Sequence, residues 1–181
     1  TNTGQIIEIA RLDSGSPTSL MTISRAGSDT IELPGQTGLT STTLTAVNSR
    51  LRLVADGTSK WIGSVEEAGT YTPTLDNTTN IAASTAYQCQ FMRVGKVVTV
   101  SGKVDVDPTA PAAASALGIS LPIASNLGAL EDCSGTAFAS GIAGQGAAIR
   151  ANIANDRAEM ALVSGDITNQ PMYFSLCYEI I

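Results

Sequence analysis

The sequence contains no histidine, and only 14% of its 181 residues are charged. Without an imidazole, Ser-His-Asp and Cys-His catalytic arrangements and His-containing zinc sites each lack a required member. Acidic residues outnumber basic ones by 16 to 10, for a net charge of −6, and the basic residues are scattered along the chain. We therefore expect no nucleic-acid partner. A hydrophobic share of 43% with so little charge also excludes a disordered chain.

Cysteine is scarce and widely spaced, at positions 89, 133 and 177. This spacing excludes a CxxC metal site and a dense disulfide framework, and an odd number leaves at least one thiol without a partner in the chain. Cys89 and Cys177 alternate with aromatic residues in 87–91 and 174–178, so we expect each to share the aromatic face as a small buried side chain. A catalytic thiol would lack a base to lower its pKa.

No hydrophobic run is long enough to suggest a membrane span. The most apolar stretch, 110–130, is mainly alanine and is broken by proline, glycine, serine and asparagine. It is too apolar for a solvated loop and too broken for a helix. Two interpretations stay open, an axial segment of an oligomer and a strand with a loop on the subunit's own core. The first residues show no basic segment followed by an apolar one, so we expect no signal peptide.

What the chain does contain is strand-length apolar runs separated by turn residues, which predicts an all-β protein. Asp56-Gly57 is the clearest hairpin signal. The runs before Gly63 are 5–9, 20–24, 30–33, 43–47, 51–54 and 60–62.

The strands lengthen after this point. Residues 96–106 carry the best alternation in the chain, which predicts a half-buried antiparallel strand with Val98, Val100, Val104 and Val106 on one face. Residues 87–94 precede it across Gly95 as a second hairpin. Further expected strands are 118–121, 133–142, 147–153, 158–163 and 172–180, with Asn155-Asp156 as a turn. We divide the chain into a β subdomain, 1–63, and a second domain, 64–181.

Two blocks of sequence resemble the C-terminal regions of tailed-bacteriophage fibre, spike and related virion proteins. The first is the Ile31-Glu-Leu-Pro-Gly35 segment followed by 51–61, which ends in a D-G-T turn and Trp61. The second has a G-T-Y-T-P opening at 69–73, an R-x-G-K turn at 93–96, an L-P element at 121–122 and an aromatic last strand, 172–178. No heptad coiled coil or long shaft precedes the first block, unlike in the longer members.

The resemblance implies a small N-terminal β collar followed by a jelly-roll-like antiparallel β-sandwich head that forms a homotrimer on the virion surface. Its implied partners are other virion proteins and a host-surface glycan or outer-membrane receptor. A surface with little charge and much threonine, alanine and glycine independently favours oligomerisation. We expect a non-enzymatic tail fibre or spike tip that attaches the particle to its host, located on the tail rather than the capsid.

Candidate receptor-contacting residues are aromatic, because a sugar stacks its apolar face on an exposed ring. Trp61 and Tyr71 are the candidates, although Trp61 at a strand end more often fills a core. No cofactor, metal ligand or catalytic residue is predicted. The glycines of 141–146 match neither GxGxxG nor a P-loop and indicate a tight bend.

Two alternative functions stay open. One is a trimeric capsid-decoration protein that stabilises the shell. The other is a tailspike enzyme that degrades polysaccharide, which needs two carboxyl groups about 5–10 Å apart. Asp105 and Asp107 share a strand face at such a spacing, although carboxylates on a polar strand face are usually only solvated. The other candidate acids are Glu66, Glu67, Glu131, Asp132, Asp156 and Glu159.

Overall fold

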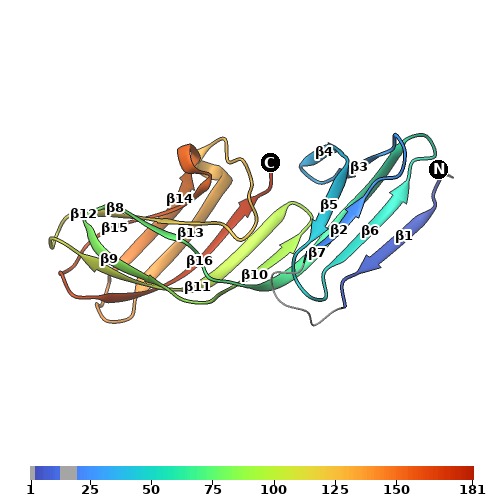
Figure 1. Cartoon of the computed structure of the whole chain (residues 1–181). Helices are drawn as coiled ribbons and strands as arrows, with labels where there is room; N and C mark the ends of the chain where they lie inside the picture. Colours follow the sequence, from blue (N-terminus) through green and yellow to red (C-terminus); the bar gives the residue numbers. More distant parts are fainter. Residues whose placement is uncertain (1–2, 13–19) are drawn as a thin grey trace. The chain divides into compact units, whose positions relative to one another are not determined.

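A computed structural model describes residues 3–12 and 20–181, and β-strands dominate it (Figure 1). Within these ranges there is no α-helix, and the two helical turns, Leu130–Asp132 and Ile153–Asn155, are short 3-10 segments. Antiparallel pairing dominates in the described ranges, and one pair in the N-terminal part is parallel. The predicted all-β sandwich class is confirmed. In the part of the chain that the structure describes, no helix has the length and hydrophobicity to cross a membrane.

The chain forms two compact units, and three strands contribute residues to both. Unit 1 comprises Thr1–Gly69 and Met92–Val98, and unit 2 comprises Thr70–Phe91 and Thr99–Ile181. The position at which the sequence analysis divides the chain, after Gly63, lies inside strand β7 (Lys60–Tyr71).

Unit 1 is built from two layers of short strands. One layer pairs β1 (Ile6–Ala10), β6 (Arg50–Ala55) and β7, with β3 (Thr30–Leu33) parallel to β7 and β4 (Gln36–Leu39) beside β3. The other pairs β2 (Met21–Ser24) with β5 (Ser41–Leu44). The core between them contains the buried side chains Ile31, Leu33, Leu44, Leu51, Leu53 and Val65.

The predicted Asp56-Gly57 hairpin joins β6 to β7. Gly57 has a φ of +87°, which a residue with a side chain rarely adopts. The Asp56 carboxylate accepts the N–H groups of Thr58, Ser59 and Lys60 at 2.7, 3.0 and 3.0 Å. These donors, Lys60 and Thr58 foremost, lower the pKa of Asp56.

Two buried charged side chains hold the segment after β5 in unit 1. Glu67 accepts the N–H groups of Thr45 and Ala46 at 2.8 and 2.7 Å, and it also accepts the Thr45 hydroxyl. Arg11, 1% exposed, donates to the carbonyl oxygens of Leu44 and Thr45 at 3.4 and 2.5 Å. The backbone of this segment therefore has partners although it lies outside the ladders.

Unit 2 is a single antiparallel sheet that curls back on itself (Figure 1). Its ends, β8 and β9, follow one another in the chain across Asn80, while β9 pairs with β11 and β8 with β12. The Asn80 amide joins this turn to its surroundings by donating to Ala110 O, Ser115 Oγ and Ser164 Oγ at 3.0, 2.8 and 3.3 Å. The strand order is β9-β11-β16-β13-β14-β15-β12-β8, and β10 also pairs with β11.

The strands of unit 2 have the following bounds, those of β10 and β11 extending into unit 1: β8 Leu75–Thr79, β9 Ile81–Ala86, β10 Cys89–Val94, β11 Val97–Pro108, β12 Ala114–Ile119, β13 Cys133–Ala139, β14 Gly146–Asn152, β15 Arg157–Val163 and β16 Gln170–Glu179. The alternation predicted for 96–106 is confirmed, because all four valines of β11 that we placed on one face are buried. The predicted 147–163 hairpin is confirmed as β14 paired with β15. The strands β4, β8 and β9 were not predicted.

The apolar stretch 110–130 contains β12, whose Leu117 and Ile119 are fully buried in unit 2. The strand lies between β15 and β8. Of the two interpretations left open for this stretch, packing on the subunit's own core therefore describes β12.

The three cysteines are free, with Cys89 and Cys133 buried and Cys177 partly exposed. Cys89 shares the face of Phe91, as expected, and both are buried. The same expectation is wrong for Cys177. The two-residue period of β16 places Cys177 with the exposed Tyr173 and Ser175, on the opposite face from the buried Phe174 and Tyr178.

Candidate functional site

The two aromatic residues singled out in the sequence are engaged within their own units. Trp61 is half-buried against the core of unit 1, and its Nε1 donates to the Asp29 carboxylate at 3.3 Å. Tyr71 is half-buried in unit 2, where its hydroxyl donates to Ser120 O at 3.3 Å and its ring meets Phe91 edge-on at 6.2 Å. Burial raises the pKa of Tyr71. Neither ring offers a broad open face to a ligand.

The most exposed aromatic pair in the described residues lies elsewhere, on the outer face of unit 2. Phe138 of β13 and Tyr173 of β16 stand directly opposite each other across the two paired strands. They are 58% and 41% exposed, and their rings stack with centroids 5.6 Å apart and planes 21° apart. We call this pair the aromatic platform.

The third exposed aromatic residue, Tyr87, differs because its ring is covered. The Lys103 Nζ lies 3.7 Å from the ring centroid, and the Tyr87 hydroxyl donates to Asp105 at 2.7 Å. Lys103 also forms an ion pair with Asp105 at 3.2 Å. These contacts occupy the ring face and the hydroxyl of Tyr87 within the chain.

A hollow of about 560 Å³ adjoins the aromatic platform, lined by residues 138–146. On the β14 side, the residue opposite Phe138 is Gly146. A Cβ at Gly146 would meet nothing closer than Ala137 O at 3.7 Å, so the space above this glycine is open. A second hollow of about 660 Å³ continues on the other side of the 142–146 segment over β14 and β15. No charged residue lines either hollow.

The loop that forms this hollow is fixed by hydrogen bonds. The buried Gln145 side chain donates to Val163 O at 2.8 Å and accepts the Gly165 N–H at 2.7 Å. Ala139 donates its N–H to Gln145 O at 3.0 Å, and Ser140 donates its N–H to Pro171 O at 3.2 Å. Gly144 turns the loop with a φ of +79°. The bend that the sequence predicted over 141–146 is therefore a loop beside the aromatic platform, and hydrogen bonds fix its conformation.

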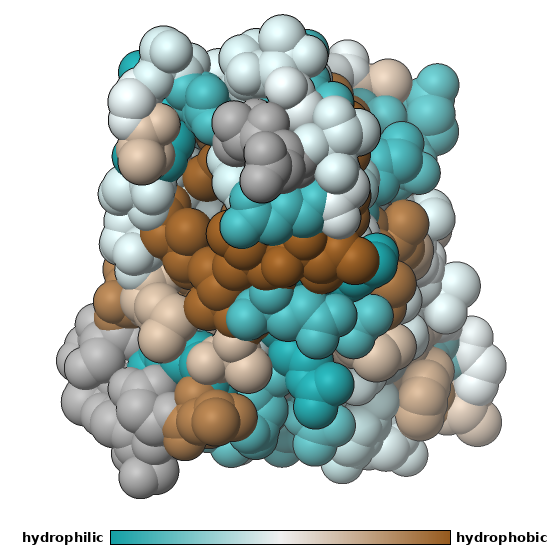
Figure 2. Space-filling view, turned by 90° about the vertical axis from the view of Figure 1, so that its right-hand side faces the viewer, coloured by the Kyte–Doolittle hydropathy of each residue, from teal (hydrophilic) through white to brown (hydrophobic). Residues whose placement is uncertain are grey.

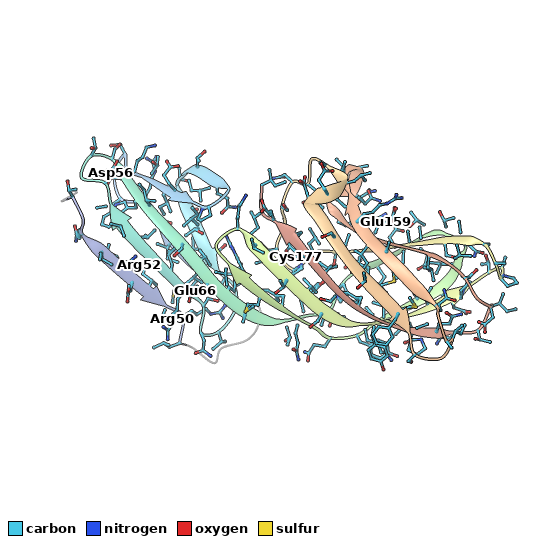
Figure 3. All side chains as sticks on the ribbon, turned by 180° about the vertical axis from the view of Figure 1, so that it is seen from behind. Arg50, Arg52, Asp56, Glu66, Glu159 and Cys177 are labelled. Atoms are coloured by element: carbon cyan, nitrogen blue, oxygen red, sulfur yellow. The ribbon has the colours of Figure 1, made fainter. Side chains whose placement is uncertain are left out.

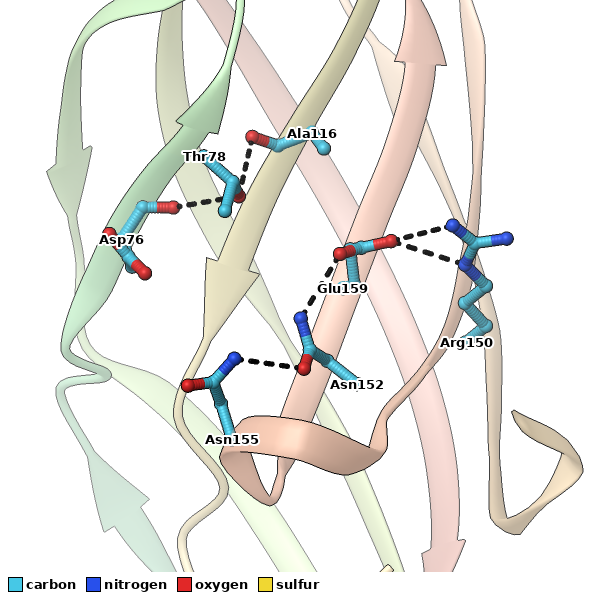
Figure 4. Close-up of polar contacts among 7 residues, drawn as sticks. All are labelled: Asp76, Thr78, Ala116, Arg150, Asn152, Asn155 and Glu159. Atoms are coloured by element: carbon cyan, nitrogen blue, oxygen red, sulfur yellow. Dashed lines mark hydrogen bonds and ion pairs between the residues drawn. The ribbon is translucent and has the colours of Figure 1, made fainter. Parts of the chain in front are cut away.

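On β14 the same face carries Arg150, four residues beyond Gly146, and Figure 4 shows its contacts with neighbouring side chains. Arg150 donates to Glu159 Oε1 from Nε and Nη2 at 3.1 and 2.8 Å, and Asn152 donates to the other carboxylate oxygen at 3.1 Å. Arg157 forms an ion pair with Asp76 at 2.5 Å and so joins β15 to β8. These contacts join three strands of the sheet, β14, β15 and β8.

The carboxylates considered for polysaccharide cleavage have structural partners at several positions. Asp105 is held by Lys103 and Tyr87, as described above, and Asp107 follows it on β11. Glu67 is buried under the backbone of unit 1, whereas its neighbour Glu66 is exposed (Figure 3). Asp156 accepts the N–H groups of Ser125 and Leu127 at 3.3 and 2.9 Å. The described residues include no group of three or more Cys, Asp or Glu side chains placed to hold a metal ion.

Two of the thiols, Cys89 and Cys133, lie in environments that favour the neutral form. Burial, with a smaller contribution from the neighbouring Cys177, raises the pKa of Cys133 to about 12. Burial also raises the pKa of Cys89. These two thiols are therefore poor nucleophiles at neutral pH.

A second exposed feature is the outer face of β1, β6 and β7 in unit 1. Ile6, Val54 and Ile62 form a row across the three strands, and Ile6 and Ile62 are 52% and 54% exposed. The next rows carry charge, with Arg52 3.5 Å from Glu8, and Arg50 opposite Glu66. Figure 3 places Arg50, Arg52 and Glu66 on the neighbouring strands.

These charged rows border a groove of about 450 Å³. From the side on which β1 is drawn, Figure 2 shows a continuous hydrophobic band between hydrophilic areas. Unit 1 thus exposes apolar surface beside charge of both signs.

Comparison with known protein-family models, with curated proteins and with solved structures finds no match for this chain.

The sequence analysis missed Phe138 and Tyr173 as a site, although it predicted strands over both. Period-two alternation in 172–178 does separate Tyr173 from the buried Phe174. That signal shows that one aromatic residue of the strand faces outward. It does not show which residue of another strand lies opposite.

Proposed function

We propose that this chain is a non-enzymatic virion protein of a tailed bacteriophage, a homotrimeric tail fibre or spike tip that attaches the particle to its host surface. The order of motifs that resembles such proteins supports this assignment. The all-β architecture, in which the motifs form hairpins and strands, agrees with it. Unit 2 corresponds to the head and unit 1 to the collar in this proposal.

The observation that carries the attachment role is the aromatic platform. Exposed aromatic pairs are uncommon on the surface of a protein with so few aromatic residues, and contiguous apolar surface usually marks an interaction site. Phe138 and Tyr173 project from two central strands of a continuous sheet. Such strands hold the rings in one geometry, so binding a receptor costs little ordering entropy.

The outer face of β1, β6 and β7 supports self-association. The Ile6–Val54–Ile62 row leaves two large apolar side chains more than half exposed. Burial of such side chains is worth about 1.5–3 kcal/mol each. We assign this face to contacts between subunits. Three heads held together would then strengthen weak individual receptor contacts through avidity.

Two measurements test the proposal. Native mass spectrometry at micromolar concentration should give about 56 kDa, three times the 18.6 kDa of the chain. Immunogold labelling of intact particles should place the protein at the tail tip. A stably folded single subunit contradicts the trimer. Label on the head shell, with binding to emptied capsids and not to host cells, contradicts attachment and indicates a decoration protein.

A further inference from the structure

The aromatic platform and its adjoining hollow have the chemistry of a sugar-binding site. We infer that they bind a neutral pyranose unit of a host-surface polysaccharide, stacked on the ring of Phe138. This inference rests on the proposed attachment function and names the ligand class and the residues that bind it.

The open face of Phe138 is the first reason. One side of its ring is stacked on Tyr173, and the strand position on the other side is occupied by Gly146. Because glycine has no side chain, that ring face borders an open hollow. The C–H face of a pyranose is apolar and slightly positive, so it packs on the negative face of an aromatic ring.

The polar groups around the platform are the second reason. Thr136 and Ser175 are opposite each other one row along the same face, and both are exposed. Ser140 is exposed in the loop beside the hollow. Hydroxyl groups donate and accept, and they therefore match the hydroxyl groups of a sugar in either sense.

The absence of charge in the lining selects the ligand further. An acidic sugar or a phosphate would call for an arginine or lysine in the hollow, and the lining residues include neither. The closest cation in the strand register, Arg150, is already paired with Glu159. A neutral hexose, hexosamine or deoxyhexose fits this environment.

A contact between subunits is the competing use of the same surface. A subunit interface favours a broad apolar core. Here the two rings are bordered by hydroxyl groups on one side and a concave glycine-lined hollow on the other. These features favour a small polar ligand, and the experiment below separates the two uses.

The test uses the full chain and an array of bacterial O-antigen and capsular oligosaccharides that includes neutral and acidic members. The wild-type protein should bind at least one neutral glycan. In solution, sugar C–H protons of that glycan should shift upfield, because they lie over an aromatic ring. Phe138→Ala should remove the upfield shift and weaken binding at least tenfold.

Gly146→Val serves as the second variant, because its side chain projects into the open space beside the Phe138 ring and leaves both rings in place. It should also weaken binding at least tenfold. Ile153→Ala is the matched control, since Ile153 is an exposed apolar residue at the other end of β14. Its affinity should equal that of the wild type, and all three variants should keep the wild-type mass in native mass spectrometry.

Four results would overturn the inference: no glycan bound by the wild type, binding confined to acidic glycans, binding unchanged by Phe138→Ala, or loss of the trimer in that variant. The last result would assign the platform to a subunit contact. Label at the tail tip without glycan binding would leave the attachment function standing and remove only the sugar site. Glycan binding by a protein located on the head shell would support the sugar site and contradict the attachment function.

Discussion

Single carboxylates stabilise the irregular segments of this β protein by accepting hydrogen bonds from them. Backbone N–H groups outside a sheet need acceptors, and a carboxylate can accept several of them. Asp156 does this for the segment after Ser125, and Asp166 accepts the N–H and the hydroxyl of Thr168 at 2.9 and 2.7 Å. These aspartates therefore act structurally, as Glu67 does inside unit 1.

Substitution of Asp156 should separate its two contributions. The residue has a φ of +46°, a conformation that costs alanine more free energy than asparagine. We expect Asp156→Ala to lower the free energy of unfolding by about 2–3 kcal/mol, from lost hydrogen bonds and a strained backbone. Asp156→Asn should lower it by about 1 kcal/mol. Urea unfolding measures both, and equal losses would contradict this explanation.

Glu66 and Glu67 form a matched pair, because adjacent residues of one strand face opposite sides. Glu67 is 4% exposed and accepts three hydrogen bonds at one oxygen. Glu67→Ala should cost about 2–4 kcal/mol of unfolding free energy, and Glu67→Gln, which keeps an acceptor, about 1 kcal/mol. Glu66→Ala should change it by less than about 0.5 kcal/mol. A comparable loss from Glu66→Ala would show that the assignment of faces is wrong.

At the scale of elements, alternation and turn chemistry decide most of the structure. The β11 and β16 strands follow a two-residue period, and Gly57 and Gly95 supply positive φ at two hairpins. The strands that the sequence analysis missed lack this signal. The β8 strand is polar throughout after Leu75, and β9 is mostly small residues. Their strand state depends on pairing with β12 and β11, which are distant in the chain.

Two strand glycines should respond oppositely to the same substitution. A Cβ at Gly135 would lie 2.3 Å from Ser175 O, a backbone atom that cannot move away. Gly135→Ala should therefore lower the free energy of unfolding by about 2–3 kcal/mol. Gly146→Ala meets open space and should be neutral or stabilise by up to about 1 kcal/mol. Thermal and urea unfolding compare the two, and destabilisation by Gly146→Ala would contradict the open hollow.

At the scale of the whole molecule, the absence of histidine removes the usual titration between pH 5 and 8. The pKa values of Asp56 and Asp166 are lowered by hydrogen-bond donors. Partial burial acts to raise the pKa of Asp156, but the N–H groups of Leu127, Asn126 and Ser125 outweigh it, so its pKa is lowered too. On the alkaline side, burial raises the pKa values of Cys89 and Cys133.

The free energy of unfolding should therefore be nearly constant over a broad range of pH. A lowered carboxyl pKa contributes stability above its unfolded value of 3.8, and this contribution is lost as pH falls through the folded value. A raised thiol pKa contributes stability below its unfolded value of 9.0, and it is lost as pH rises toward the folded value. We expect unfolding free energies from urea titrations to agree within about 1 kcal/mol from pH 5 to 8. A steep slope inside that window would contradict this account.

The all-β class, the main hairpins and the inner faces of the best alternating strands could all be predicted from the amino-acid sequence alone. These follow from local rules, because a two-residue period and a Gly or Asp turn act over a few neighbouring residues. The absence of imidazole chemistry also follows from the sequence, because the composition contains no histidine whatever the fold.

Which strands lie side by side is known only from the folded sheet. Strand pairing joins segments that are distant in the chain, and the local sequence of a strand does not specify which other strand it pairs with. That pairing places Phe138 opposite Tyr173 and leaves a glycine on the other side of the ring, whereas Trp61 and Tyr71 are turned inward to hydrogen-bond acceptors. The candidate site is a product of register, and register is a property of the folded sheet.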